Sequence, residues 1–466
     1  MKDQHQHLRD FRRANKLKQK DLAEALGISI NELMRYERGF EDLPRQMQQA
    51  LASIGKIAPD AWSKAAACGE GYVTSKAENG RVFRRRSPIS DGKKYVFDLF
   101  CGVGGFSHGF EKTGEFEVAL GIDLLGDRLD TFCENHASAT AFGGDIRDLT
   151  IEQVDEHGPR PFVIVGGPPC QGFSSLRPFR NVEWNDPRNN LAEEFVRIVG
   201  VLQPEWIVFE NVVGLLTHAG GKTFKSVSAA FEEVGYRTSA RIMNGAHFGL
   251  PQKRERLILI GSRRGKTIDW PKATHRFPQR SMAGQSDLVV WPDDGLFGTE
   301  LADAVTFSEA TSDLPELSSG EKATFYKEGV ALTSYQKLMR AGSQTLTLHE
   351  ATKHSDKMLE IIHHAGVNIH ALPPGMVTSG FSSCYSRLAA DEPSTTITVN
   401  FVHPASNRCI HPSQDRALTP REGARLQSFE DSFRFMGSRT QTVKQIGNAV
   451  PPLMGRIVAE TILRSD

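Results

Sequence analysis

The sequence predicts an α/β protein in three parts: an N-terminal all-α domain, a doubly wound and mostly parallel sheet, and a smaller irregular domain. Three observations predict this fold class. From Lys94 onward, short apolar runs alternate with amphipathic helical stretches, the pattern of parallel strands joined by crossover helices. The alternation stops between residues 264 and 380, where Pro, Gly, Ser and His are frequent. Residues 6–56 instead show helical periodicity.

The length of 466 residues favours more than one domain. We expect a helical domain over residues 1–56, a linker over 57–92, the first part of the α/β domain over 93–263, an inserted smaller domain over 264–380 and the completion of the α/β domain over 381–466.

Composition limits the compartment and the partners. The net charge of zero hides a basic start, because residues 1–94 hold 19 Lys and Arg against 12 Asp and Glu. Such a segment suits a polyanion, although a solvated charged face explains it equally well. No apolar run approaches the roughly 20 residues that span a bilayer, and no secretory signal is seen. The six cysteines form no Cys-x-x-Cys pair, so we expect neither metal binding nor disulfides, and a bacterial cytoplasmic location.

The N-terminal helices have helix–turn–helix spacing. Gly27 follows the second helix where a tight turn needs positive φ, and Ser29 with Glu32 forms a capping box for the third. The apolar residues expected inside are Leu22, Ala23, Leu26, Ile28, Leu33 and Tyr36. The outer face then presents Ile30, Asn31, Met34 and Arg35, which are the candidate DNA contacts. Residues 8–44 resemble the helix–turn–helix of phage-repressor-like regulators, which implies DNA binding; a protein-binding helical cap is the open alternative.

In the α/β part, we expect strands over 95–100, 116–122, 162–165, 206–209 and 257–260, with helices over 190–202 and 222–234. The first strand is followed by a glycine-rich turn, Phe100-Cys-Gly-Val-Gly-Gly105, which allows a ligand to approach the backbone. The second strand ends at Asp123, where a carboxylate can bind ribose hydroxyls, and Asp145 with Ile146 follows the third strand. Without a P-loop lysine, these features suggest a nucleoside that carries no triphosphate.

Chemically reactive residues follow the next strands. Cys170 stands on a turn after Gly-Gly-Pro-Pro, where ligands of open α/β sheets bind, so it is a candidate nucleophile. A buried structural cysteine is the alternative. Glu210 ends a later strand and is placed for acid chemistry. The segment Gln252-Lys-Arg254-Glu-Arg256 should direct Gln252, Arg254 and Arg256 to one side of a strand.

Taken in order, these motifs resemble the 5-methylcytosine DNA methyltransferases. The matching blocks are 98–106, Asp123, Asp145, 166–174, 210–212, 252–256 and 445–452. They lie within 94–263 and 385–463, roughly half of the chain. A specific signature is formed by the series Pro-Cys-Gln, Glu-Asn-Val and Gln-x-Arg-x-Arg. The chain departs from the family pattern at two positions: Asp123 stands where the family has Glu, and Glu430 stands where it often has Pro.

The resemblance implies a Rossmann-like S-adenosylmethionine-dependent methyltransferase fold and assigns roles to residues. Cys170 would add to C6 of a flipped cytosine, Glu210 in its acid form would bind N3, and Arg256 with Arg254 would hold O2 and a phosphate. The loop 171–188 is a candidate lid over the base. The residues implied to bind S-adenosylmethionine are Phe100, Val103, Gly104, Gly105, Asp123, Asp145, Ile146, Pro169 and Asn448.

The implied partner is duplex DNA, read in sequence by 264–380, with an operator as a second site for the N-terminal domain. A cognate restriction endonuclease is a functional partner that the resemblance allows. Two alternatives stay open at this point. One is a transfer-RNA cytosine methyltransferase with the same chemistry, and the other is a cofactor-sensing transcription regulator. Intact Cys170, Glu210 and Arg256 weigh against the regulator.

Overall fold

The computed structural model describes residues 8, 12, 19, 22, 23, 26, 28, 33 and 36, the backbone of 81–83, and residues 87–150, 154, 159–169, 191–278, 280–284, 286–293, 301–377 and 380–466. The chain divides into two compact units, residues 1–80 and 81–466.

The described residues of the first unit form a small apolar core. Leu8, Leu22, Ala23, Leu33 and Tyr36 are buried, and Leu26 and Ile28 pack against them. The carbonyl of Ala23 accepts a hydrogen bond from the amide of Ile28 at 3.0 Å, across the tight turn expected at Gly27. The predicted inward-facing residues are therefore confirmed. The outer residues Ile30, Asn31, Met34 and Arg35 lie outside the described residues.

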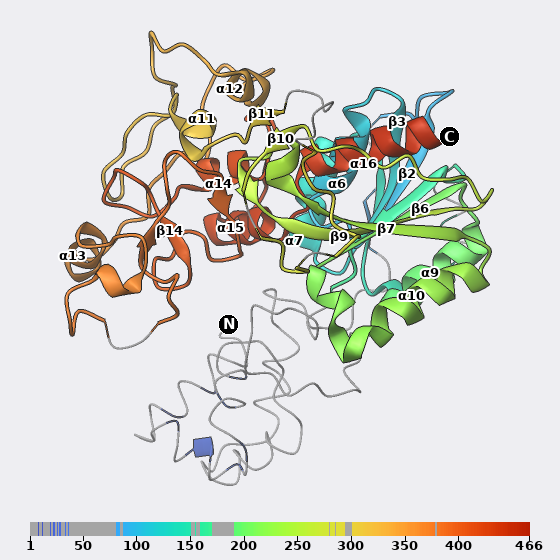
Figure 1. Ribbon diagram of the computed structural model, residues 1–466, viewed down its shortest axis with the longest axis horizontal. Helices are drawn as coiled ribbons and strands as arrows, with labels where there is room; N and C mark the ends of the chain where they lie inside the picture. Colours follow the sequence, from blue (N-terminus) through green and yellow to red (C-terminus); the bar gives the residue numbers. More distant parts are fainter. Residues whose placement is uncertain are drawn as a thin grey trace. The chain divides into compact units, whose positions relative to one another are not determined.

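The second unit is built on an eight-stranded sheet in the order β1-β4-β3-β2-β5-β6-β9-β7 (Figure 1). The pairs from β4 to β6 are parallel, whereas β1 and β9 run antiparallel to their neighbours, so the predicted mostly parallel sheet is confirmed. The strands are β1 (Arg81–Phe83), β2 (Lys94–Leu99), β3 (Phe116–Asp123), β4 (Thr140–Gly143), β5 (Val163–Gly166), β6 (Trp206–Asn211), β7 (Arg237–Asn244) and β9 (Glu255–Ser262).

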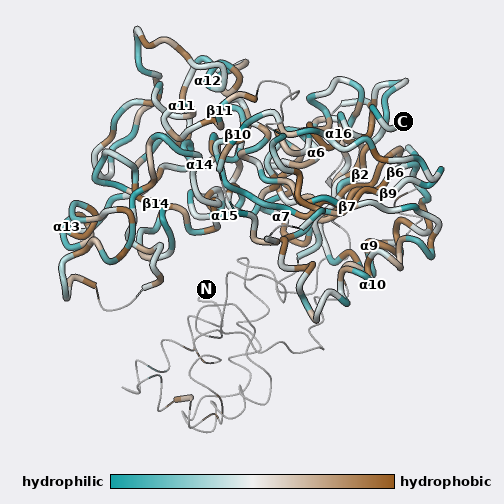
Figure 2. The backbone as a smooth tube through the Cα atoms, viewed as in Figure 1, coloured by the Kyte–Doolittle hydropathy of each residue, from teal (hydrophilic) through white to brown (hydrophobic). Residues whose placement is uncertain are grey.

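Helices cover both faces of this sheet. On one face, alternate strand residues such as Val96 and Val165 pack against α6 (Gly105–Glu111), α7 (Gly126–Asn135) and α16 (Pro452–Ser465). On the other face, Phe97 and Ile164 pack against α9 (Leu191–Leu202) and α10 (Lys222–Glu233). Figure 2 shows the strands as an apolar layer between these helices. Because β2 and β5 are apolar on both faces, they can only be central strands.

A second core lies beside the sheet (Figure 1). Phe307 and Tyr335 pack there with Phe401 and Phe433, so residues on both sides of position 380 share one core. The described elements within 264–380 are short, which agrees with the irregularity expected there. They are β10 (His275–Arg276), β11 (Ala302–Asp303), α11 (Phe307–Thr311), α12 (Ser334–Met339) and α13 (Asp356–His363). Outside that range lie β8 (Gln252–Lys253), β12 (Ser386–Arg387), β13 (Ser394–Thr395), β14 (Arg408–Ile410), α14 (Pro420–Leu426) and α15 (Arg439–Asn448).

The C-terminal helix returns to the start of the α/β domain. Gly455 of α16 lies so close to α6 that a Cβ atom there would be 2.2 Å from the carbonyl oxygen of Phe106. A side chain at this position would therefore separate the two helices. Among the described helices, none is long and apolar enough to span a membrane.

Candidate active site

The carboxyl ends of the parallel strands meet at one edge of the sheet, and Asp123 ties two of them together. Its Oδ2 accepts a hydrogen bond from the amide of Gly102 after β2, and its Oδ1 accepts one from the amide of Leu125, both at 2.9 Å. The carboxylate is thus held in place by backbone donors, and further lone pairs remain for hydroxyl groups of a ligand.

The glycine-rich turn leaves room for a ligand against its backbone. Phe100 adopts φ 63°, an unfavourable conformation for a bulky residue and one that often marks a functional site. At Gly102, φ is also positive, and no atom lies within 4 Å of where a Cβ would be. Gly105 is constrained instead, because a Cβ there would lie 2.4 Å from the carbonyl oxygen of Val450. This turn combines an open backbone with close packing against the C-terminal segment.

The other predicted cofactor residues fall into two groups. Val103 is buried in the second core and Ile146 in the core of the sheet, so their side chains can support a ligand only indirectly, through packing. Pro169 and Asn448 are exposed at the strand and helix ends. Asp145 accepts a hydrogen bond from Nε of Arg147 at 2.9 Å, and this bond holds the pKa of Asp145 below its ordinary value.

Leu124 is a candidate that the sequence reasoning missed. It follows Asp123 directly and is 62% exposed, and Leu125 beside it is 36% exposed, so the two leucines give an apolar surface next to the carboxylate. The sequence signal was present, since the apolar run continues past the carboxylate, but its exposure depends on where β3 ends.

Glu210 and Arg256 form an ion pair at the end of β6. The distance between Nε of Arg256 and Oε1 of Glu210 is 2.9 Å, and both side chains are largely buried. Gly167, after β5, approaches from the other side, because a Cβ there would lie 2.7 Å from Oε2 of Glu210. The structure therefore brings together two of the predicted catalytic residues, and a glycine makes room for the carboxylate.

The turn before Cys170 is fastened to the same strand end. The side-chain amide of Asn211 donates a hydrogen bond to the carbonyl oxygen of Pro168 at 3.3 Å. This contact places the Pro168-Pro169 turn beside Glu210. Cys170 and the predicted lid 171–188 lie outside the described residues.

Arg254 takes a position different from that of Arg256. Its guanidinium is buried and donates to the carbonyl oxygens of Ile397 at 3.3 Å and Ala449 at 2.9 Å. Burial, together with the charge of Arg256, holds the pKa of Arg254 well below its ordinary value. Gln252 is buried beside it and donates to the carbonyl oxygen of Leu426 at 2.9 Å. The contact with Ala449 joins the strand segment to the end of α15, next to Asn448.

The expected alternation along this segment holds only in part. Glu255 is buried as well, and its carboxylate accepts a hydrogen bond from the amide of Met282 at 2.8 Å. Arg254 lies between β8 and β9 and belongs to neither strand. The two-residue alternation of a single strand therefore does not apply across it.

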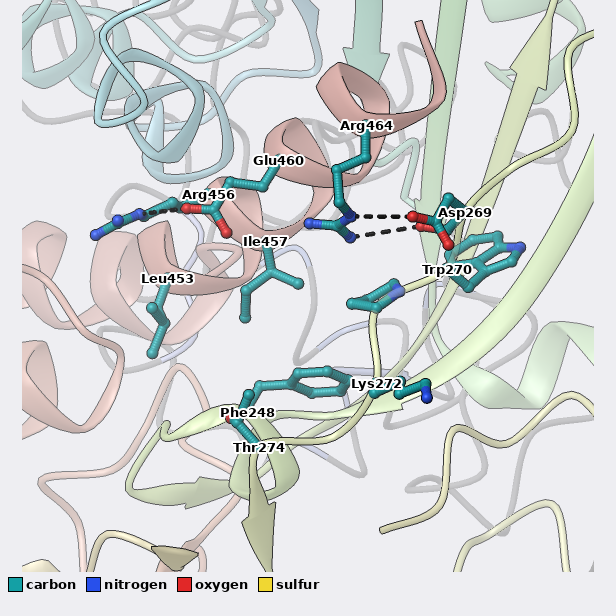
Figure 3. Close-up of a pocket in the computed structure, with 11 residues that line it drawn as sticks. Phe248, Asp269, Trp270, Lys272, Thr274, Leu453, Arg456, Ile457, Glu460 and Arg464 are labelled. Carbon is teal, nitrogen blue, oxygen red and sulfur yellow. Dashed lines mark hydrogen bonds and ion pairs between the residues drawn. The ribbon is translucent and has the colours of Figure 1, made fainter. Parts of the chain in front are cut away.

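A separate cavity of about 490 Å³ lies between α16 and the segment after β9 (Figure 3). Its apolar lining residues include Trp270 and Ile457. At its rim, Arg464 pairs with Asp269 at 3.4 Å and Arg456 pairs with Glu460 at 2.8 Å. None of the predicted site residues lines this cavity.

Comparison with known families agrees with this geometry. A family model described as C-5 cytosine-specific DNA methylase matches residues 95–464. A model described as Helix-turn-helix matches residues 8–47.

Individual proteins give the same result. The chain is 32% identical to Type II methyltransferase M1.HphI of Haemophilus parahaemolyticus, over 79% of this chain and 86% of that protein. It is 32% identical to Type II methyltransferase M.AgeI of Thalassovita gelatinovora, over 79% and 98%. A crystal structure from E. coli, described as a prophage-encoded DNA modification methyltransferase, shares the fold with a TM-score of 0.61 at 24% identity, over 80% of this chain and 99% of that one.

Proposed function

Because this chain belongs to the C-5 cytosine-specific DNA methylase family, we propose that it transfers a methyl group from S-adenosylmethionine to C5 of a cytosine in duplex DNA. The observation that carries the proposal is the Glu210–Arg256 pair at the end of β6, beside the turn that leads to Cys170. An acid, a cation and a thiol on one sheet edge are what nucleophilic activation of a pyrimidine needs.

The residues at the strand ends fit an adenosyl group. The backbone at Gly102 is open, the carboxylate of Asp123 is held by two amides, and Leu124 offers an exposed apolar surface next to it. Phe100 and Asn448 complete the proposed site at the ends of β2 and α15. S-adenosylmethionine bound there supplies an electrophilic methyl group.

The chain's own residues then activate the base. The thiolate of Cys170 adds to C6 of the cytosine, while Glu210 in its acid form donates a hydrogen bond to N3 and stabilises the adduct. Nε of Arg256 contacts Oε1 of Glu210, which leaves the other carboxyl oxygen to carry the proton that is donated to N3. In this proposal the guanidinium of Arg256 also holds O2 of the base. After C5 has gained the methyl group, a base accepts the C5 proton while the bond between C6 and the sulfur breaks, which restores aromaticity and frees the thiolate of Cys170. The cytosine must leave the base stack for these groups to reach it.

The Glu210→Gln variant tests the acid role. Glutamine keeps the shape of the side chain but cannot transfer a proton, so we expect the single-turnover rate of methylation to fall by about 10²- to 10⁴-fold. Transfer of tritiated methyl groups to duplex DNA measures it. Glu205→Gln is a matched control, because Glu205 pairs with Arg264 at 2.7 Å just before β6, away from the strand end. Equal losses in both variants would contradict the proposal.

Arg254 has a positioning role in this proposal. Replacing it with methionine leaves the carbonyl oxygen of Ile397 without this donor and that of Ala449 with only the longer hydrogen bond from Gln427 at 3.3 Å, and Ala449 adjoins Asn448. We expect the KM for S-adenosylmethionine to rise on the order of tenfold, the scale of one lost hydrogen bond. Arg254→Lys should recover part of the affinity by donating to one carbonyl. If the KM for DNA changes instead, Arg254 contacts the base or the phosphate, as expected from the sequence.

The N-terminal helix–turn–helix implies a second DNA contact, and we propose that it binds an operator site separately from methylation. Residues 1–80 form a compact unit of their own. Deleting residues 1–80 should therefore leave the methylation rate within about twofold of the full chain, while electrophoretic mobility shifts with operator DNA are lost. A truncated chain that stays folded but transfers no methyl group would show that the two parts do not act separately. A restriction endonuclease of the same specificity is the proposed functional partner.

A further inference from the structure

Three side chains with ligand atoms for metals meet below the glycine-rich turn, apart from the catalytic pair. His108 and Glu111 are three residues apart on α6 and therefore share a face of the helix. His136 comes from a different element, at the C-terminal cap of α7. One ligand atom from each of the three lies within 4.8 Å of the others.

The ring nitrogens of His108 have no hydrogen-bond partner among the described residues. Both of its ring nitrogens are buried and neither makes a hydrogen bond there. Its ring contacts the rings of His136 and Phe433 edge-on, and these contacts satisfy neither nitrogen. A buried imidazole without partners is unfavourable, and such a group calls for a missing water or ion.

His136 is oriented as a ligating histidine would be. Its Nε2 lies 3.3 Å from the carbonyl oxygen of Gly104, which can only accept, so this nitrogen carries the hydrogen. Its Nδ1 then faces Oε2 of Glu111 at 2.8 Å. Metal-binding histidines commonly donate their second nitrogen to a backbone carbonyl in this way.

A proton between His136 and Glu111 is the alternative occupant. Burial lowers the pKa of His136, but the charge of Glu111 outweighs it and raises this pKa above its ordinary value. A protonated His136 satisfies Glu111 and Gly104. It provides nothing for His108, whose two nitrogens stay unpaired. A divalent cation satisfies all three side chains.

We propose that His108, Glu111 and His136 form a zinc site that supports the glycine-rich turn, with ligation by one nitrogen of His108, Nδ1 of His136 and a carboxylate oxygen of Glu111. Two imidazoles and one carboxylate suit Zn²⁺, with a water as fourth ligand, whereas Mg²⁺ and Ca²⁺ prefer oxygen ligands alone. Glu111 is 24% exposed and gives the ion a way in.

The proposed zinc site stabilises the glycine-rich turn and takes no part in the reaction. His136 contacts the carbonyl of Gly104, and a Cβ on Gly104 would lie 2.4 Å from Nε2 of His136. A bound ion that holds His136 in place therefore also restrains Gly104, the N-cap of α6. This inference does not depend on methyl transfer.

Zinc retention tests the site directly. The full-length chain is stripped with a chelator, dialysed against Zn²⁺ and analysed for bound metal, with the melting temperature recorded with and without Zn²⁺. We expect the natural chain to retain one zinc per chain more than His108→Leu, and its melting temperature to rise with Zn²⁺. Leucine suits the apolar contact that His108 makes with Phe433. Glu111→Gln should also lose this zinc, whereas His370→Leu, at an exposed histidine, should keep it.

Because zinc can also bind thiols elsewhere in the chain, the difference between variants decides the result. Equal zinc retention by the natural chain, His108→Leu and Glu111→Gln would overturn the proposal, as would an equal effect of Zn²⁺ on their melting temperatures. The Glu111→Gln variant keeps the comparison meaningful if the leucine variant does not fold.

Discussion

Replacing Cys170 with alanine should abolish methyl transfer, with kcat lower by on the order of 10⁴- to 10⁶-fold, the scale of loss when a covalent nucleophile is removed. Without the thiolate, C5 of cytosine is not activated. Cys101, the described thiol at the end of β2, is buried, and burial raises its pKa well above the ordinary value, so it does not replace Cys170. Tritiated S-adenosylmethionine and duplex DNA of mixed sequence measure the reaction, and mapping the labelled cytosines identifies the recognised site.

Cys384→Ala is the control for the loss of a cysteine as such. Cys384 is buried and lies outside the eight-stranded sheet, between α13 and β12 in the sequence. It should methylate at the natural rate. A folded natural chain that binds DNA but transfers no methyl group would favour a cofactor-sensing regulator. Residual transfer by Cys170→Ala at more than about one hundredth of the natural rate would exclude the thiol as nucleophile.

The strands and their order along the chain were predictable because each carries a local signal. Residues 96–99 alternate between the two faces of the sheet. Asp123 ends β3 as expected, and Glu210 lies one residue before the end of β6. The positions of β4 and β7 were harder to predict. β7 pairs antiparallel with β9, and such an edge arrangement leaves little trace in composition.

The surroundings of the site residues were not predictable from local pattern. Arg254 and Arg256 are two positions apart and look equivalent in sequence, yet one is buried against Ile397 and Ala449, and the other pairs with Glu210. The difference depends on chain segments more than 140 residues away. The meeting of His108 with His136 likewise depends on how α6 and α7 pack.

Buried charge in α14 accounts for the second large effect that we expect. Arg425 donates from Nε to Oδ1 of Asp431 at 3.0 Å and from Nη2 to Oδ2 of Asp313 at 3.0 Å. All three side chains are fully buried. Burial raises the pKa of Asp431, but hydrogen bonds from Arg425 and the charge of Arg421 outweigh it and hold this pKa below its ordinary value. Asp431 therefore stabilises the fold above its ordinary pKa, and this stability is lost as the pH falls through the lowered value.

Replacing Arg425 with methionine should lower the free energy of unfolding by about 3–5 kcal/mol, because two buried carboxylates lose their shared cation. Urea denaturation at neutral pH measures it. Arg456→Met is the matched control, since Arg456 pairs with Glu460 on an exposed helix face and should cost less than about 1 kcal/mol. Adding Asp313→Leu to Arg425→Met should recover part of the stability, because it removes one of the uncompensated charges. If Arg425→Met lost no more stability than the control, water or Arg421 would be neutralising Asp431. The apolar side chains of the second core would then account for the stability of this part of the chain.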